Sequence, residues 1–112
     1  MKRVIDYSGQ NILIMGLGTH GGGIGVARFL VSRGAKVTVT DLRSKESLGA
    51  SVEALAGLPI RFVLGEHQHL DFSSTDMVIR NPGVDLNSPF LATARRSGVP
   101  IEMEMSLFFS EW

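Results

Sequence analysis

Short apolar runs alternate with helical segments along this chain of 112 residues, and this alternation restricts the fold more than any other feature. The runs have the length and composition of buried strands and cover residues 11–15, 36–40, 60–64, 76–80 and 100–105. Helical spacing and end signals predict helices over residues 24–34, 44–59 and 87–98, with a loop over residues 65–75 and a short helical end over residues 106–112.

Strands that alternate with helices form parallel sheets, because each crossover between parallel strands needs about a dozen residues and is almost always right-handed. We therefore predict an α/β fold, a Rossmann-like doubly wound five-stranded parallel sheet with helices on both faces. The predicted strand order is 3-2-1-4-5, in one domain over residues 1–112. Ligands of such sheets bind at the carboxyl ends of the strands, beside the point where the strand order reverses.

Composition excludes several classes of function. Eleven basic residues balance eleven acidic ones, so no strong field attracts nucleic acid or a membrane surface. The apolar fraction of 44% is that of a globular domain, and no run is long enough to span a bilayer. The absence of cysteine and of a signal peptide leads us to expect a cytoplasmic protein without disulfides or thiolate metal sites.

The stretch "GLGTHGGGIG" places six glycines in ten residues directly after the first predicted strand. Gly16, Gly18 and Gly21 match G-x-G-x-x-G, with a strand before the motif, a helix after it, and Asp41 20 residues after Gly21. Glycines let the backbone approach a phosphate, which the free N–H groups at a helix N-terminus favour. A nucleotide diphosphate is the favoured ligand, and a flexible turn without a ligand is the alternative.

Asp41 would accept a hydrogen bond from a ribose hydroxyl or a base N–H, or else it caps the following helix. The same fingerprint is found in NAD sites, so an NAD-binding regulatory module and a small oxidoreductase stay open as alternatives. Against them, the second half of the chain is short and offers no set of His, Lys and Tyr for proton transfer. No metal site is predicted.

The remaining candidate side chains have simpler explanations. His20 lies in the glycine loop, where it either contacts phosphate or is exposed. His67 and His69 are interpreted as surface residues, because an i, i+2 pair in a polar loop is seldom a metal site. Glu102 and Glu104 point the same way from the last strand and are interpreted as solvent-facing or as part of a domain junction.

Six segments resemble, in their order and spacing, the N-terminal domain of the Mur ligases: "GLG…G", "FLVSRGAKVTVTDLR", "LGEH", "RNPGV", "SPFLATARRSGVPI" and "EMEMSLFF". The resemblance covers about residues 7–112 and is strongest to the ligases of peptidoglycan synthesis that add D-glutamate to UDP-N-acetylmuramoyl-L-alanine. In that family the domain is Rossmann-like and binds the UDP part of the muramoyl substrate instead of NAD.

Carried over by position, the resemblance implies that the glycine loop meets the diphosphate, that residues 41–43 contact uridine and that the turn at 81–83 closes the crevice. The implied site consists of Gly18, Thr19, His20, Gly21, Gly22, Gly23, Asp41, Leu42, Arg43, Asn81, Pro82 and Gly83. The loop is two residues longer than the family pattern "GLGxSG", so Thr19, His20 and Gly22 are all candidates for the family's hydroxyl contact.

The family continues into an ATP-binding domain with a G-x-x-G-K-[ST]-like loop and then a C-terminal domain. Here Lys2, Lys36 and Lys45 are the only lysines, and none follows a glycine-rich phosphate loop. The resemblance implies an N-terminal piece of a three-domain, amide-bond-forming ligase that needs ATP and magnesium. We expect this piece to bind no cofactor, to be inactive alone, and to have the central and C-terminal domains as its partners.

Overall fold

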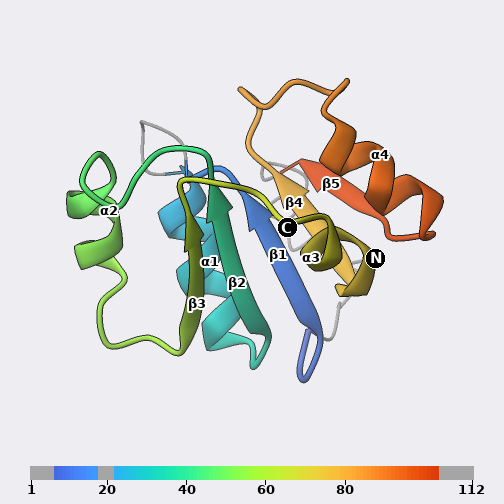
Figure 1. Ribbon diagram of the computed structural model, residues 1–112. Coiled ribbons are helices and arrows are strands. Elements are labelled where there is room, and N and C mark those ends of the chain that lie inside the picture. The colour runs from blue at the N-terminus through green and yellow to red at the C-terminus, as the bar shows by residue number, and fades with distance from the viewer. Residues whose placement is uncertain (1–6, 18–21, 104–112) are drawn as a thin grey trace.

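A computed structural model describes residues 7–17 and 22–103 of the chain. Within them lies a parallel five-stranded sheet in the order β3-β2-β1-β4-β5 (Figure 1). Its strands are β1 (Asn11–Met15), β2 (Lys36–Asp41), β3 (Ile60–Leu64), β4 (Met77–Arg80) and β5 (Ile101–Met103). The predicted fold class and strand order are confirmed.

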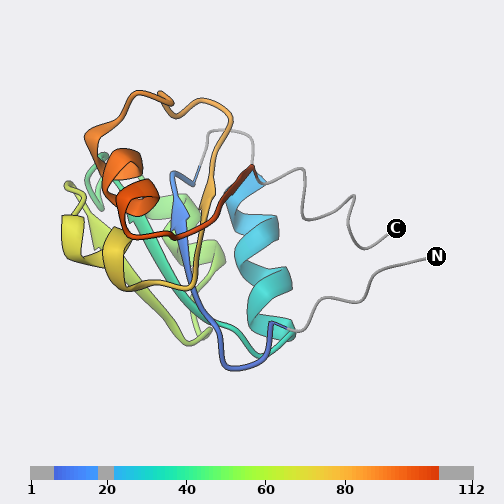
Figure 2. The ribbon, with the colours of Figure 1, turned by 90° about the vertical axis from the view of Figure 1, so that its right-hand side faces the viewer.

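Helices cover both faces of this sheet, as Figure 2 shows with α1 on one side and α3 and α4 on the other. Their bounds are α1 (Gly22–Ser32), α2 (Gly49–Ala54), α3 (His69–Ser74) and α4 (Pro89–Arg96). Strand β1 supplies both apolar layers, because alternate side chains of a strand point to opposite faces. Ile12 and Ile14 face α1, whereas Leu13 and Met15 face the layer of α4, and all four are at most 2% exposed.

The ends of α4 follow the signals in its sequence. The Ser88 hydroxyl accepts a hydrogen bond from the backbone N–H of Phe90 at 3.3 Å, and Pro89 occupies the first turn. Gly98, just past the helix, adopts φ +74°, a conformation that favours glycine. These contacts fix where α4 begins, and α4 forms one wall of the pocket described below.

Two predicted elements differ from the structure. Residues 65–75, predicted to be a loop, contain the helix α3, whose Phe72 is fully buried. The helix predicted over residues 44–59 is much shorter, although Leu48 and Leu55 at its flanks are buried in the core cluster that also contains the apolar residues of α1. The predicted helical end at residues 106–112 and the last two residues of the fifth predicted strand lie outside the described residues.

Helix α1 begins in close contact with the end of β1. The backbone N–H of Gly23 donates to the Leu17 carbonyl oxygen at 3.1 Å, and a Cβ atom at residue 23 would lie 2.6 Å from that same oxygen. Only glycine permits this approach, since the obstructing atoms belong to the backbone.

Within the described residues, no helix combines the length and the apolar character needed to cross a membrane.

Candidate functional site

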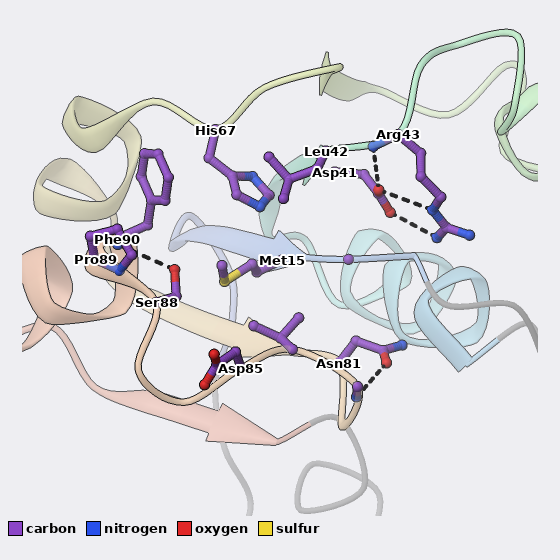
Figure 3. Close-up of a pocket in the computed structure, with 13 residues that line it drawn as sticks. Met15, Asp41, Leu42, Arg43, His67, Asn81, Asp85, Ser88, Pro89 and Phe90 are labelled. Carbon is purple, nitrogen blue, oxygen red and sulfur yellow. Dashed lines mark hydrogen bonds and ion pairs between the residues drawn. The ribbon is translucent and has the colours of Figure 1, made fainter.

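A pocket of about 560 Å³ lies at the carboxyl ends of β1, β2 and β4, where the strand order reverses (Figure 3). Met15 and Gly16 form its floor at the end of β1. One wall comes from the ends of β2 and β3, with Leu42, Arg43 and His67. The opposite wall is the connection between β4 and α4, including Asn81, Val84, Asp85, Ser88, Pro89 and Phe90. The pocket is therefore where the doubly wound fold predicts a ligand.

The Asp41 carboxylate links the first residues after β1 to the end of β2. Its Oδ2 accepts hydrogen bonds from the Leu17 backbone N–H at 3.0 Å and from Arg43 Nη2 at 2.9 Å. Its Oδ1 accepts from the backbone N–H of Arg43 at 2.9 Å and from Arg43 Nε at 3.1 Å. Burial raises the pKa of Asp41, but these hydrogen bonds outweigh it and the pKa lies below its ordinary value. The result is a neutralised ion pair at the rim of the pocket.

The turn after β4 is held against the end of β1. The backbone N–H of Asn81 donates to the Met15 carbonyl oxygen at 2.9 Å, and the Asn81 side-chain oxygen accepts from the Gly83 N–H at 2.9 Å. Gly16 has φ +88°, and a Cβ atom there would lie 3.1 Å from the Asn81 Cβ. Glycine at residue 16 therefore lets the two segments meet at the pocket floor.

His67 projects into the pocket from the segment after β3 (Figure 3). Its Nδ1 lies 2.7 Å from Thr40 Oγ1, and its ring meets Phe72 and Phe90 edge-on, with centroids 5.8 and 5.2 Å apart. Burial lowers the pKa of His67, and the nearby Asp41 opposes this effect only in part, so the imidazole is neutral at pH 7. The sequence predicts a surface residue here, whereas these partners leave His67 half-buried at the pocket.

The second histidine of the pair packs outside the pocket. His69 stacks on Phe90 with centroids 4.3 Å apart, and its Nδ1 lies 2.7 Å from Thr93 Oγ1. Among residues 7–17 and 22–103, no three His, Cys, Asp or Glu side chains are grouped as a metal ion would require. His69 thus supports the pocket wall by positioning Phe90.

The structure brings together part of the predicted site. Asp41, Leu42, Arg43, Asn81 and Gly83 line the pocket. Pro82 is exposed in the turn and is not among the lining residues. Gly22 and Gly23 are the first residues of α1, while Gly18, Thr19, His20 and Gly21 lie outside the described residues. Of the two strand carboxylates, Glu102 is exposed on β5, and Glu104 lies outside the described residues.

Sequence reasoning missed most of the apolar lining. The sequence predicts Met15 and Phe90 only as parts of a buried strand and a helix, and it predicts no role in the site for Asp85. One signal was available, because the connection after β4 must lie at the same edge of the sheet as the end of β1. The residues between the "NPG" turn and the cap of α4 could have been included on that ground.

This fold, with a pocket at its switch point, defines a Rossmann-like domain. Residues 10–102 match the family model described as "Mur ligase MurD-like, N-terminal domain". The chain therefore belongs to the MurD-like N-terminal domains of the Mur ligases.

Individual relatives agree with this assignment. The chain is 61% identical over 105 residues to the UDP-N-acetylmuramoylalanine–D-glutamate ligase of Roseiflexus sp. (strain RS-1), covering 94% of this chain and 22% of that protein. It is 46% identical over 103 residues to the ligase of the same name from Geobacter metallireducens, covering 92% and 22%. The chain thus spans about a fifth of the length of these curated relatives.

Solved structures show the same fold. UDP-N-acetylmuramate–alanine ligase of Thermotoga maritima superposes with a TM-score of 0.67 and 27% identity, over 88% of this chain and 22% of that one. A short-chain dehydrogenase/reductase of Burkholderia phymatum, solved with NAD, has a TM-score of 0.59 and 18% identity, over 84% and 44%. The second likeness concerns the fold alone.

Proposed function

We propose that this chain binds the UDP part of UDP-N-acetylmuramoyl-L-alanine, as the substrate-anchoring domain of a D-glutamate-adding ligase of peptidoglycan synthesis. The observation that carries the proposal is the pocket at the switch point, which residues 41–43 line together with Asn81 and Gly83. Membership of the Mur ligase family and the names of the relatives support this ligand over other nucleotides.

The charges of the pocket favour the uridine over the diphosphate as its occupant. Met15, Val84 and Phe90 give it apolar surfaces, and Asp85 adds a carboxylate that repels phosphate. Arg43 is the only cation among the described lining residues, and Asp41 already neutralises it. A flat, uncharged ring with polar edges suits such a site. The diphosphate then lies toward the glycine loop and the start of α1.

Anchoring is a real contribution to a ligation, although it occurs far from the reacting carboxylate. Binding energy from a remote part of a substrate reduces the freedom of the reacting group and so lowers the barrier. In the whole ligase, ATP and magnesium would activate the carboxylate for attack by the D-glutamate amine. The share of this chain is to hold and orient the nucleotide end, using the pocket residues described above.

A titration of ¹⁵N-labelled protein with UDP, with the full UDP-substrate and with NAD tests the proposal by NMR. We expect UDP to saturate with a dissociation constant of about 0.05–1 mM, with shifts at residues 41–43, His67 and 81–84, and NAD to bind more weakly. Arg43→Gln should weaken UDP binding, whereas Lys45→Gln, a neighbouring exposed cation outside this pocket, should not. Saturation by NAD at lower concentrations than UDP, with the same signals shifting, would instead support a dinucleotide-binding domain.

A further inference from the structure

The two ring nitrogens of His67 differ in their contacts with the protein. Nδ1 lies 2.7 Å from Thr40 Oγ1, on a threonine that is fully buried. No hydrogen-bond partner for Nε2 is found among the described residues, and Nε2 is not enclosed as a buried, unsatisfied atom would be. Since His67 lines the pocket, Nε2 is the polar atom that its ring offers to a ligand (Figure 3).

The two contacts of the Thr40 hydroxyl favour one tautomer of His67. Thr40 Oγ1 also lies 3.2 Å from the Glu66 carbonyl oxygen, which can only accept a hydrogen bond. In the arrangement that satisfies both contacts, the single hydroxyl proton goes to Glu66 and Nδ1–H of His67 donates to the hydroxyl oxygen. An imidazole that is neutral at pH 7 and protonated at Nδ1 has a lone pair on Nε2. His67 thus presents a hydrogen-bond acceptor to the pocket.

Aromatic contacts restrict the orientation of the His67 ring. Phe72 and Phe90 meet it edge-on, at interplanar angles of 76° and 74°. These contacts restrict rotation, because a turned ring would lose both aromatic edges and the bond to Thr40. A fixed acceptor in the wall of the pocket selects for the ligand atom that faces it, since a polar atom that a bound ligand buries without a partner is costly.

We propose that His67 is a specificity-determining residue that recognises the N3–H group of a uracil ring through Nε2, with Thr40 as its positioning residue. The inference rests on the proposed function and names the atom that reads the base. Uracil carries a proton on N3, whereas cytosine has a lone pair there. The same site therefore accepts UDP and rejects CDP, which has the same ribose and diphosphate.

Two substitutions separate the two nitrogens of His67. In His67→Asn the side-chain amide lies near the position of Nδ1, so contact with Thr40 is kept and the acceptor in the pocket is lost. In His67→Gln the longer amide reaches the position of Nε2 and restores an acceptor. Thr40→Val removes the hydroxyl that fixes the tautomer, while the shape of the residue is kept.

The experiment measures UDP, CDP and 3-methyluridine diphosphate binding to the 112-residue chain and its variants by NMR titration. We expect the parent chain to bind UDP about tenfold more tightly than either analogue, the effect of one buried hydrogen bond. His67→Asn should reduce this ratio to about one, His67→Gln should retain most of it, and Thr40→Val should lower it. Imidazole ¹⁵N shifts should show a protonated Nδ1 and an unprotonated Nε2.

Three other results would each contradict the role of His67. Equal binding of UDP and 3-methyluridine diphosphate by the parent chain would overturn the inference without any variant. A loss of affinity in His67→Asn that is equal for UDP and CDP would do the same, because it shows a structural role only. A proton on Nε2 would exclude the acceptor. In these cases UDP binding, and with it the proposed function, would stand, whereas failure of the parent chain to bind UDP would overturn both.

Discussion

At the scale of single residues, Asp41 is a motif residue whose carboxylate makes hydrogen bonds within the protein. The sequence predicts a ligand contact or a helix cap at this position. The structure shows its two oxygens accepting four hydrogen bonds, three from Arg43 and one from the Leu17 backbone N–H. A ligand hydroxyl would have to share an oxygen that already accepts two bonds. The ribose contact stays a prediction, and the established task of Asp41 is to fix the geometry of residues 17 and 43.

This task predicts a pH dependence of stability. The pKa of Asp41 is lower in the folded chain than its unfolded value of about 3.9, so its contribution is complete above that value and is lost as the pH falls through the folded pKa. Asp41→Asn should lower the free energy of unfolding at pH 7 by about 1–3 kcal/mol and should flatten its decline in acid. Urea unfolding between pH 7 and pH 2.5 measures both effects. Glu46→Gln, at an exposed carboxylate, is the control, and an equally steep decline in Asp41→Asn would contradict the assignment.

The burial of His67 could not be predicted from the sequence. The stretch "GEHQH" is polar, and nothing in its local pattern indicates burial. The partners that half bury His67 are Thr40, Phe72 and Phe90, which are 5 to 27 positions away and come together only through the packing of β2, α3 and α4. Asp41 and Asn81 were identifiable because strand ends with special residues carry their own signal.

At the scale of elements, prediction succeeded where caps and periodicity agreed. Helix α4 begins at the Ser88 cap and Pro89 and ends before Gly98, as the sequence predicts. Helix α3 carries no comparable signal, because it has six residues and its N-cap, Gln68, makes no side-chain cap bond. It is stabilised by distant contacts instead: Phe72 packs against Phe90, and Asp71 pairs with Arg61 at 2.9 Å. Short helices of this kind depend on tertiary packing, which local sequence does not reveal.

Helix α1 offers a matched pair of glycine substitutions. A Cβ atom at Gly23 would collide with the Leu17 backbone at 2.6 Å, whereas a Cβ atom at Gly25 would meet nothing within 4 Å. Gly25→Ala should therefore stabilise the chain by up to about 1 kcal/mol through helix propensity. Gly23→Ala should destabilise it by about 1–3 kcal/mol, because backbone atoms must move. Urea denaturation measures both, and a change of the same sign in both variants would refute the close approach.

At the scale of the whole molecule, the sequence predicted the fold more completely than the site. Alternating strands and helices leave few topologies, and the right-handed crossover rule selects among them, so the strand order could be derived. The pocket depends on side chains from four strand ends and from α4, whose mutual positions follow only from packing. Asp41, Arg43 and Asn81, which the motif and the resemblance indicate, lie at its polar rim. Met15 and Phe90, predicted only as parts of a strand and a helix, form apolar surfaces of the pocket.

The two apolar layers share the central strands, and this predicts that they unfold together. Leu30 in α1 and Leu91 in α4 are fully buried on opposite faces of the sheet. Loss of either layer would expose one face of β1, whose side chains alternate between both layers. Neither layer is therefore expected to persist without the other, and unfolding should be a single transition.

Residue-resolved NMR during urea unfolding tests this coupling. Leu30→Ala and Leu91→Ala should each lower the free energy of unfolding by about 2–5 kcal/mol. In both variants the amide signals of Val26 in α1 and Ala94 in α4 should disappear at one common midpoint, shifted equally from that of the parent chain. Leu70→Ala, at a side chain that is 71% exposed, should leave the midpoint almost unchanged. If Leu91→Ala shifts the midpoint at Ala94 while Val26 keeps its own, the layers unfold separately, and the shared strand does not couple them.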